Sequence, residues 1–222
     1  DTDRQHQLLS LELTKKLSDI HMPDFKGDLN SSLPKMYWID AVNISQDLHG
    51  IHHPETIDVI TSGTYIFPDD AIGMLKDALE QAEEDLIDFH PHIRHITKTI
   101  ADAYNFDMGK RRFSIPYYDN LVRYHLREPD SDPDETITSL MNYADVLDAL
   151  RMYDASLAFY KEAYKIRERT FSESNDKNEK VRILNHVIMS LVELHDVNPE
   201  AGHDLEAERY RAELSLIFDP TQ

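Results

Sequence analysis

The chain has 222 residues, of which 41% are hydrophobic, a size and composition that suit one folded domain or a short array of repeats. It contains no cysteine, which excludes disulfides and thiolate metal sites. Aspartate and glutamate total 42 against 23 lysine and arginine residues, a formal net charge of −19, so the chain as a whole repels nucleic acid and anionic membranes and favours a basic partner.

No apolar run approaches the roughly 20 residues that a membrane span needs, and neither end carries a signal-peptide pattern. Because the chain opens on "DTDRQHQ" without a methionine, we expect a longer parent or a processed precursor. The expected location is cytoplasmic, and the interior of an organelle after removal of a transit peptide is the alternative.

Helix is expected throughout, because only six glycines are present and β-branched residues rarely alternate with polar ones. Apolar periodicity predicts a first helix over 5–20, a break over 21–32 and a helix over 33–50. Further helices are expected over about 55–66, 69–88, 92–107, 115–127, 135–150, 153–171, 179–196 and 203–218. Together these segments predict ten helices in five antiparallel pairs.

A proline follows a polar residue at three points at similar intervals: His53-Pro54, His90-Pro91 and Asp132-Pro133. The spacing is 37 residues and then 42. Proline cannot continue a preceding helix, and acidic residues or threonine in a first turn favour a new one. Each pair is therefore predicted to mark the start of a helix, and the spacing indicates a repeat.

The junctions carry a family resemblance. "AVNISQDLHGIHHPETI" over 41–57 resembles the inter-repeat segment of kinesin-light-chain-type tetratricopeptide repeats, and "EAYKIRERTF" over 162–171 resembles the end of the second helix of such a repeat. "LMNYA" and "LNHVI" echo the signature of the first helix. The resemblance covers about four-fifths of the chain. It implies an all-α fold, a right-handed superhelix of antiparallel helix pairs (a TPR-like α-solenoid).

The resemblance also implies a domain organisation. Residues 1–50 would form a diverged N-terminal helical pair with a linker over 21–32. Residues 51–222 would form four TPR-like repeats, over about 54–89, 90–131, 132–176 and 177–218. In the third repeat, the small residues Ala144, Ser156 and Ala163 are expected to let the paired helices approach closely.

In arrays of this family, the first helix of each pair lines a concave groove that contacts peptides. Transferring that role by position selects Lys98, Asp102, Asn105, Met141, Asp145, Asp148, Asn185 and Met189. Asp145 and Asp148 make the groove locally acidic. A basic or amphipathic segment is therefore the expected ligand, although plain exposure is the competing interpretation for each residue alone.

The run "GKRRF" over 109–113 is the one dense basic stretch. It is expected in a turn between helices, where Lys110, Arg111 and Arg112 would dock an acidic partner or simply be solvated.

Neither a metal site nor a catalytic site is predicted. His49, His52 and His53 lie in a junction without an H-E-x-x-H pattern, so a structural role is expected and metal binding is the alternative. An EF-hand loop beginning at Asp130 would need glycine and glutamate where Glu135 and Met141 stand, so this acidic stretch is expected to cap the next helix. G-x-S-x-G, P-loop and dinucleotide-binding motifs are absent from the sequence, and no cofactor is expected.

The sequence therefore predicts a non-enzymatic scaffold or adaptor that holds a segment of another protein on the concave face of a TPR-like array. One alternative is a structural or assembly subunit of a large multiprotein complex that uses the convex face and the ends. Another is a regulatory appendage of a larger enzyme. Nucleic acid and membrane insertion are not expected.

Overall fold

The computed structural model describes residues 32–88, 90–128, 131–170 and 177–217. The chain divides into two compact units, unit 1 (Asp1–Asp107) and unit 2 (Met108–Gln222). All regular secondary structure in the described ranges is helical, which confirms the predicted all-α class. The helix predicted over 5–20 lies outside the described residues.

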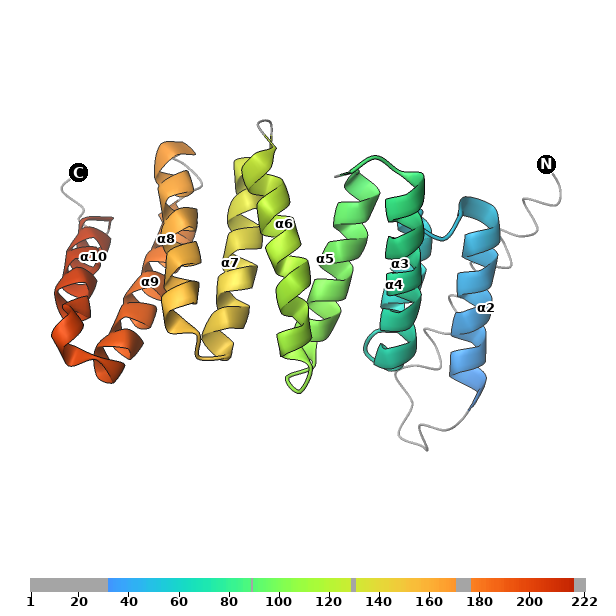
Figure 1. Ribbon diagram of the computed structural model, residues 1–222, viewed down its shortest axis with the longest axis horizontal. Coiled ribbons are helices and arrows are strands. Elements are labelled where there is room, and N and C mark those ends of the chain that lie inside the picture. The colour runs from blue at the N-terminus through green and yellow to red at the C-terminus, as the bar shows by residue number, and fades with distance from the viewer. Residues whose placement is uncertain (1–31, 89, 129–130, 171–176, 218–222) are drawn as a thin grey trace. The chain divides into compact units, whose positions relative to one another are not determined.

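The described part of unit 1 contains four helices: α2 (Ser32–His49), α3 (Pro54–Ser62), α4 (Pro68–Asp85) and α5 (Pro91–Phe106). Figure 1 shows that consecutive helices of this unit run in opposite directions. Helix α2 packs on α3 and α4 packs on α5, while α3 also contacts α4 and α5. The side chains buried most completely between these helices are Trp38, Ile57, Ile60, Leu75, Ile96 and Ile100.

Trp38 fixes the end of α3. Its indole is fully buried, and its Nε1–H donates a hydrogen bond to the carbonyl of Val59 at 2.9 Å. Gly63 lies directly against the ring, where a Cβ would stand 2.3 Å from Trp38 Cε2. Helix α3 therefore ends at Ser62 and a turn leads to α4, so the predicted helix over 55–66 was too long.

The predicted helix starts at the three proline junctions are confirmed. Helices α3, α5 and α7 (Pro133–Ala149) each begin at the proline. In each, the side chain before the proline accepts a hydrogen bond from the backbone N–H two residues on: His53 Nδ1 at 3.3 Å, His90 Nδ1 at 3.1 Å and Asp132 Oδ1 at 3.0 Å. This is N-capping, as expected for the acidic stretch at Asp132.

The described part of unit 2 contains, besides α7, the helices η1 (Arg111–Ser114), α6 (Ile115–Arg127), α8 (Tyr153–Thr170), α9 (Lys177–Val197), η2 (Pro199–Ala201) and α10 (His203–Ile217). Helices α7 and α8 share the most extensive packing, and α8 also packs on α9, which packs on α10. Ala144, Ser156 and Ala163 are completely buried. Their small size lets the backbones of α7 and α8 come close, as predicted.

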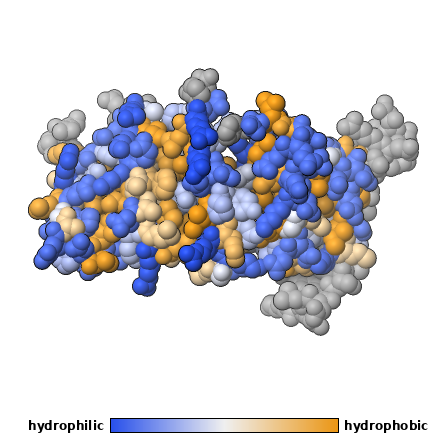
Figure 2. All heavy atoms as spheres, in the orientation of Figure 1, coloured by the Kyte–Doolittle hydropathy of each residue, from blue (hydrophilic) through white to orange (hydrophobic). Residues whose placement is uncertain are grey.

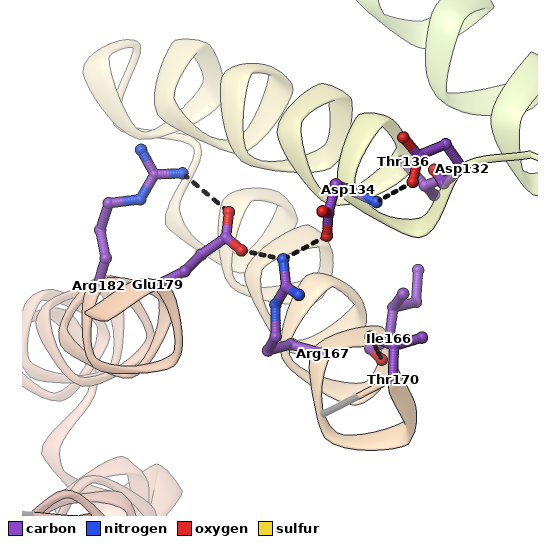
Figure 3. Close-up of polar contacts among 8 residues, drawn as sticks. All are labelled: Asp132, Asp134, Thr136, Ile166, Arg167, Thr170, Glu179 and Arg182. Atoms are coloured by element: carbon purple, nitrogen blue, oxygen red, sulfur yellow. Dashed lines mark hydrogen bonds and ion pairs between the residues drawn. The ribbon is translucent and has the colours of Figure 1, made fainter. Parts of the chain in front are cut away.

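One buried cation joins three helices of unit 2, as Figure 3 shows. Arg167 on α8 is only 3% exposed. Its Nη2 lies 2.8 Å from Asp134 Oδ1 in the first turn of α7, and it also bonds Glu179 in the first turn of α9. Both carboxylates thus sit at helix N-termini, where negative charge is favourable.

Hydrophilic side chains occupy much of the face shown in Figure 2, with apolar side chains between them. Within the described ranges, no helix combines the length and the hydropathy that a membrane crossing requires.

Candidate partner-binding surfaces

In unit 1, α3 and α5 pack together and form the walls of a cavity of about 300 Å³. Two residues predicted from the sequence, Lys98 and Asp102, line it. The full lining is Asp58, Thr61, Thr64, Tyr65, His95, Lys98, Thr99, Asp102, Ala103 and Phe106. The third residue predicted on α5, Asn105, is half-buried and does not line the cavity.

Polar side chains form one wall of this cavity. Lys98 Nζ lies 2.6 Å from Asp102 Oδ2, and His95 Nε2 lies 3.5 Å from Asp58 Oδ1. All four side chains are substantially exposed, so the pairs contribute little to stability. They are accessible to a partner, and two of the four are carboxylates.

An aromatic pair forms the apolar part of the cavity. Tyr65 and Phe106 are 68% and 67% exposed, and their ring centroids lie 4.8 Å apart in an edge-to-face arrangement. Neither is among the residues predicted from the sequence. The sequence does contain a signal for Tyr65. The spacing between His53 and His90 is 37 residues, and Tyr65 stands 37 residues before Asp102 just as Thr61 stands 37 residues before Lys98.

In unit 2, the predicted residues Asp145 and Asp148 on α7 face side chains of α9. Asp145 Oδ1 accepts a hydrogen bond from the Tyr160 hydroxyl at 2.6 Å and lies 3.7 Å from His186 Nδ1. The Ser190 hydroxyl donates to Asp148 Oδ1 at 3.4 Å. The structure therefore brings the two aspartates together at the α7–α9 contact.

Burial acts on the ionisation of this cluster. It raises the pKa of the Tyr160 hydroxyl, an effect that the hydrogen bond to Asp145 reinforces, so the phenol remains a donor. Burial also raises the pKa of Asp148, against the opposing effects of the Ser190 hydrogen bond and of His186. The ionised Asp148 is therefore held in less favourable surroundings than water.

Helix α9 adds apolar surface beside these carboxylates. Met189 is 64% exposed and Val192 is also exposed, while Asn185 is exposed one turn before Met189. Asn185 and Met189 thus occupy the accessible positions predicted for them. The α7 and α9 faces combine negative charge with apolar side chains.

Met141 does not belong to this surface. It is 1% exposed, because α7 packs against α6 on one side and α8 on the other. That packing buries a wide arc of the helix, and Met141 lies within the arc beside Leu140 and Ala144. The prediction that Met141 contacts a partner is therefore wrong for this structure.

The basic run forms the start of unit 2. Lys110 precedes η1, which contains Arg111 and Arg112. Arg112 is exposed, whereas Lys110 and Arg111 are half-buried. Two apolar side chains, Met108 and Phe113, flank the run and are largely exposed.

The histidines in the described part of unit 1 gather at the starts of α3 and α5. Among the described residues, no group of three or more histidine, aspartate and glutamate side chains has an arrangement that could hold a metal ion.

Comparison of the sequence with protein-family models and with curated proteins gives no match. Solved structures do match. The TPR-like repeats of a Podosopora anserina kinesin light chain superpose with a TM-score of 0.64 over 99% of this chain and 98% of that one, at 13% identity. A single-residue variant of that protein gives 0.63 over 96% and 95%, at 12% identity.

A third structure, BtubC (BKLC) from P. vanneervenii, matches with a TM-score of 0.57 over 96% of this chain and 91% of that one, at 13% identity. The fold is that of a TPR-like repeat array. The resemblance predicted from the inter-repeat segment is thereby confirmed at the level of fold, as is the α-solenoid class. The boundaries of the four repeats remain a prediction.

Proposed function

We propose that this TPR-like chain is a non-catalytic scaffold that holds a segment of another protein against α3 and α5 in unit 1 and against α7 and α9 in unit 2. A TPR-like fold is suited to binding proteins, because stacked hairpins present a preformed surface. A bound segment then bears most of the ordering cost.

The observation that carries the proposal is the mixed face of α7 and α9. Asp145 and Asp148 on α7 contact His186 and Ser190 of α9, and α9 also exposes Met189 and Val192. Apolar side chains supply binding energy, while charges at the rim set the sign of the partner and its rate of association. A basic amphipathic segment fits both features, and the net charge of −19 steers such a segment toward the chain.

A defined probe tests the charge preference. An amphipathic peptide of leucine and lysine at helical spacing is compared with a leucine and glutamate peptide of the same length, by fluorescence anisotropy. We expect the basic peptide to bind the chain and the acidic one to bind at least about tenfold more weakly. Equal binding of the two peptides, or no binding of the basic one, would reject the proposed partner chemistry.

Charge reversal tests the location. Asp145→Lys with Asp148→Lys should weaken binding of the basic peptide by about tenfold or more. The matched control is Glu128→Lys with Glu200→Lys, which changes the net charge equally at exposed positions outside α7 and α9. If the control weakens binding as much as the test variant, the peptide responds to overall charge and the α7–α9 face is not its site.

A second candidate function is an assembly subunit that binds through its end. Leu205 and Leu216 on α10 are both largely exposed, and their spacing of eleven residues puts them on one side of the helix. Light scattering during size-exclusion chromatography tests this candidate. Self-association that Leu205→Ser with Leu216→Ser abolishes would support it, and a monomer at high concentration would count against self-assembly through α10.

We also propose the basic turn of Lys110, Arg111 and Arg112 as a docking point for an acidic segment. Its charge is opposite to that of the rest of the chain, and the exposed Met108 and Phe113 beside it add apolar contact area. The leucine and glutamate peptide described above tests this proposal. It should bind the natural chain weakly, and this binding should disappear in the variant with Arg111→Glu and Arg112→Glu.

A further inference from the structure

Six histidines meet where α3 and α5 begin. His49 ends α2, His52 and His53 precede α3, and His90, His92 and His95 surround the start of α5. The His92 ring centroid lies 4.7 Å from that of His90, 5.9 Å from that of His52 and 6.0 Å from that of His53, and His49 stacks on His53 at 5.0 Å. We refer to these six side chains as the histidine cluster.

Two members of the histidine cluster act as helix caps, and they need an unprotonated nitrogen to do so. His53 Nδ1 accepts from the N–H of Glu55, and His90 Nδ1 accepts from the N–H of His92. An imidazolium has a donor at both nitrogens and cannot accept. It would also place positive charge at a helix N-terminus, where the helix dipole disfavours it.

Carboxylates lie only at the edge of the histidine cluster. Glu55 on α3 is 3.0 Å from His49 Nε2, Asp85 on α4 is 3.6 Å from His52 Nε2, and Asp58 on α3 is 3.5 Å from His95 Nε2. Arg94 on α5 adds a permanent positive charge to the same helix. The centre of the histidine cluster, at His92, is surrounded by other imidazoles.

Four ring nitrogens of the histidine cluster are buried without a hydrogen-bond partner. Nε2 of His49 and Nε2 of His95 lie near the carboxylates of Glu55 and Asp58, whereas the other two, Nδ1 of His52 and Nδ1 of His92, lie inside the histidine cluster. A proton placed on either would leave a buried charged donor unpaired, which is costly. At these two nitrogens the interior of the histidine cluster offers an added proton no acceptor.

We propose that the histidine cluster makes unit 1 acid-sensitive: protonation removes the N-caps of α3 and α5 and loosens both helices, while α7 keeps its N-cap, because Asp132 rather than a histidine provides it. This property goes beyond the proposed scaffold function. It would act on the same two helices that form the unit 1 cavity.

The direction of the pH dependence follows from His92. Its pKa is lowered from 6.5, first by burial and then by His90, His52, His53 and His95. A lowered pKa means that the unfolded chain takes up this proton first as the pH falls. The stability that neutral His92 contributes is therefore complete above pH 6.5 and is lost progressively below it, toward the folded pKa.

The experiment is hydrogen exchange of the whole chain at about pH 7.5 and about pH 5.5, with protection corrected for the intrinsic effect of pH. We expect protection of α3 and α5 to fall about fivefold at the lower pH, since each helix loses one cap that accounts for about 1 kcal/mol and 1.4 kcal/mol is a factor of ten. Protection of α7 and α8 should stay within about threefold, because the N-cap of α7 is a carboxylate and not an imidazole.

Exchanging the caps between junctions provides the matched variants. His53→Asp with His90→Asp gives unit 1 the cap that Asp132 already provides in the same His/Asp-Pro setting, and should reduce the loss at α3 and α5 to under about threefold. Asp132→His should make α7 acid-sensitive.

Three results would overturn the proposal: unchanged protection of α3 and α5, an equal loss in every helix, or a full loss in the variant with aspartate caps. Fluorescence gives an independent measure, because Trp38, the single tryptophan, is buried in unit 1. If the variant with aspartate caps fails to fold, the comparison of α7 between the Asp132→His variant and the natural chain still decides the question.

Discussion

Gly63 shows how a single position can decide the packing of unit 1. A Cβ there would stand 2.3 Å from Trp38 Cε2, and the buried indole cannot move without losing its bond to Val59. We therefore expect Gly63→Ala to lower the free energy of unfolding by about 2 kcal/mol or more, as in other overpacked cores. Urea unfolding followed by Trp38 fluorescence measures it.

The control is Gly73→Ala. Gly73 lies inside α4 with open space where its Cβ would be, so alanine should raise stability by about 0.5–1 kcal/mol through helix propensity. If both substitutions change stability in the same direction, the clash with Trp38 is not what matters at Gly63.

Substitutions at Tyr65 and Phe106 also act through individual side chains, but we expect them to change binding rather than stability. Because both rings are about two-thirds exposed, Tyr65→Ser with Phe106→Ser should leave the urea midpoint almost unchanged while weakening binding of the basic amphipathic peptide several-fold, provided that the peptide uses unit 1. Ile87→Ser is the control, since Ile87 is 80% exposed and does not line the cavity. A loss of stability as large as the loss of binding would identify the pair as structural.

At the scale of helices, Arg167 makes α7, α8 and α9 depend on one buried guanidinium. Its two carboxylates differ, since Asp134 is 71% exposed and Glu179 only 28%. We expect Glu179→Gln to cost about 1–3 kcal/mol, because it weakens the pairing of a buried charge, and Asp134→Asn to cost less than about 1 kcal/mol. Thermal unfolding by far-UV circular dichroism measures both. Equal costs would mean that burial of the partner is irrelevant here.

Helix positions in this chain follow from local chemistry, so most of them could be predicted. Helices α3, α5 and α7 start at Pro54, Pro91 and Pro133, because proline fits the first turn of a helix and cannot continue a preceding one. The end of α3 could not be predicted in this way, because Gly63 ends the helix against Trp38, a residue far away in the sequence.

The candidate site was predicted less completely, for a similar reason. A residue's place on its own helix identified Lys98 and Asp102, which do line a cavity. The same reasoning misplaced Met141. The number of sides of a helix that are covered depends on the neighbouring helices, and α7 has packing partners on two sides. The role of Arg167 also depends on three helices meeting, which periodicity does not contain.

For the whole molecule, the net charge of −19 should give salt two opposite effects. Self-repulsion of the folded chain weakens when salt screens it, so Tm should rise by a few degrees between about 20 mM and about 300 mM NaCl. The same screening removes the attraction for the basic peptide, so its affinity should fall over that range. Ion pairs act against the first effect, but exposed pairs such as Lys35–Asp70 and Lys98–Asp102 each contribute little.

The change of Tm with salt and the change of peptide affinity with salt should both be smaller in the Glu128→Lys with Glu200→Lys variant. This variant moves the net charge four units closer to neutrality and leaves α7 and α9 unchanged. A Tm that falls with salt would mean that attractive pairs outweigh repulsion in the folded chain. Peptide affinity that ignores salt would mean that the contact is apolar, and that Asp145 and Asp148 lie beside the bound segment without choosing its charge.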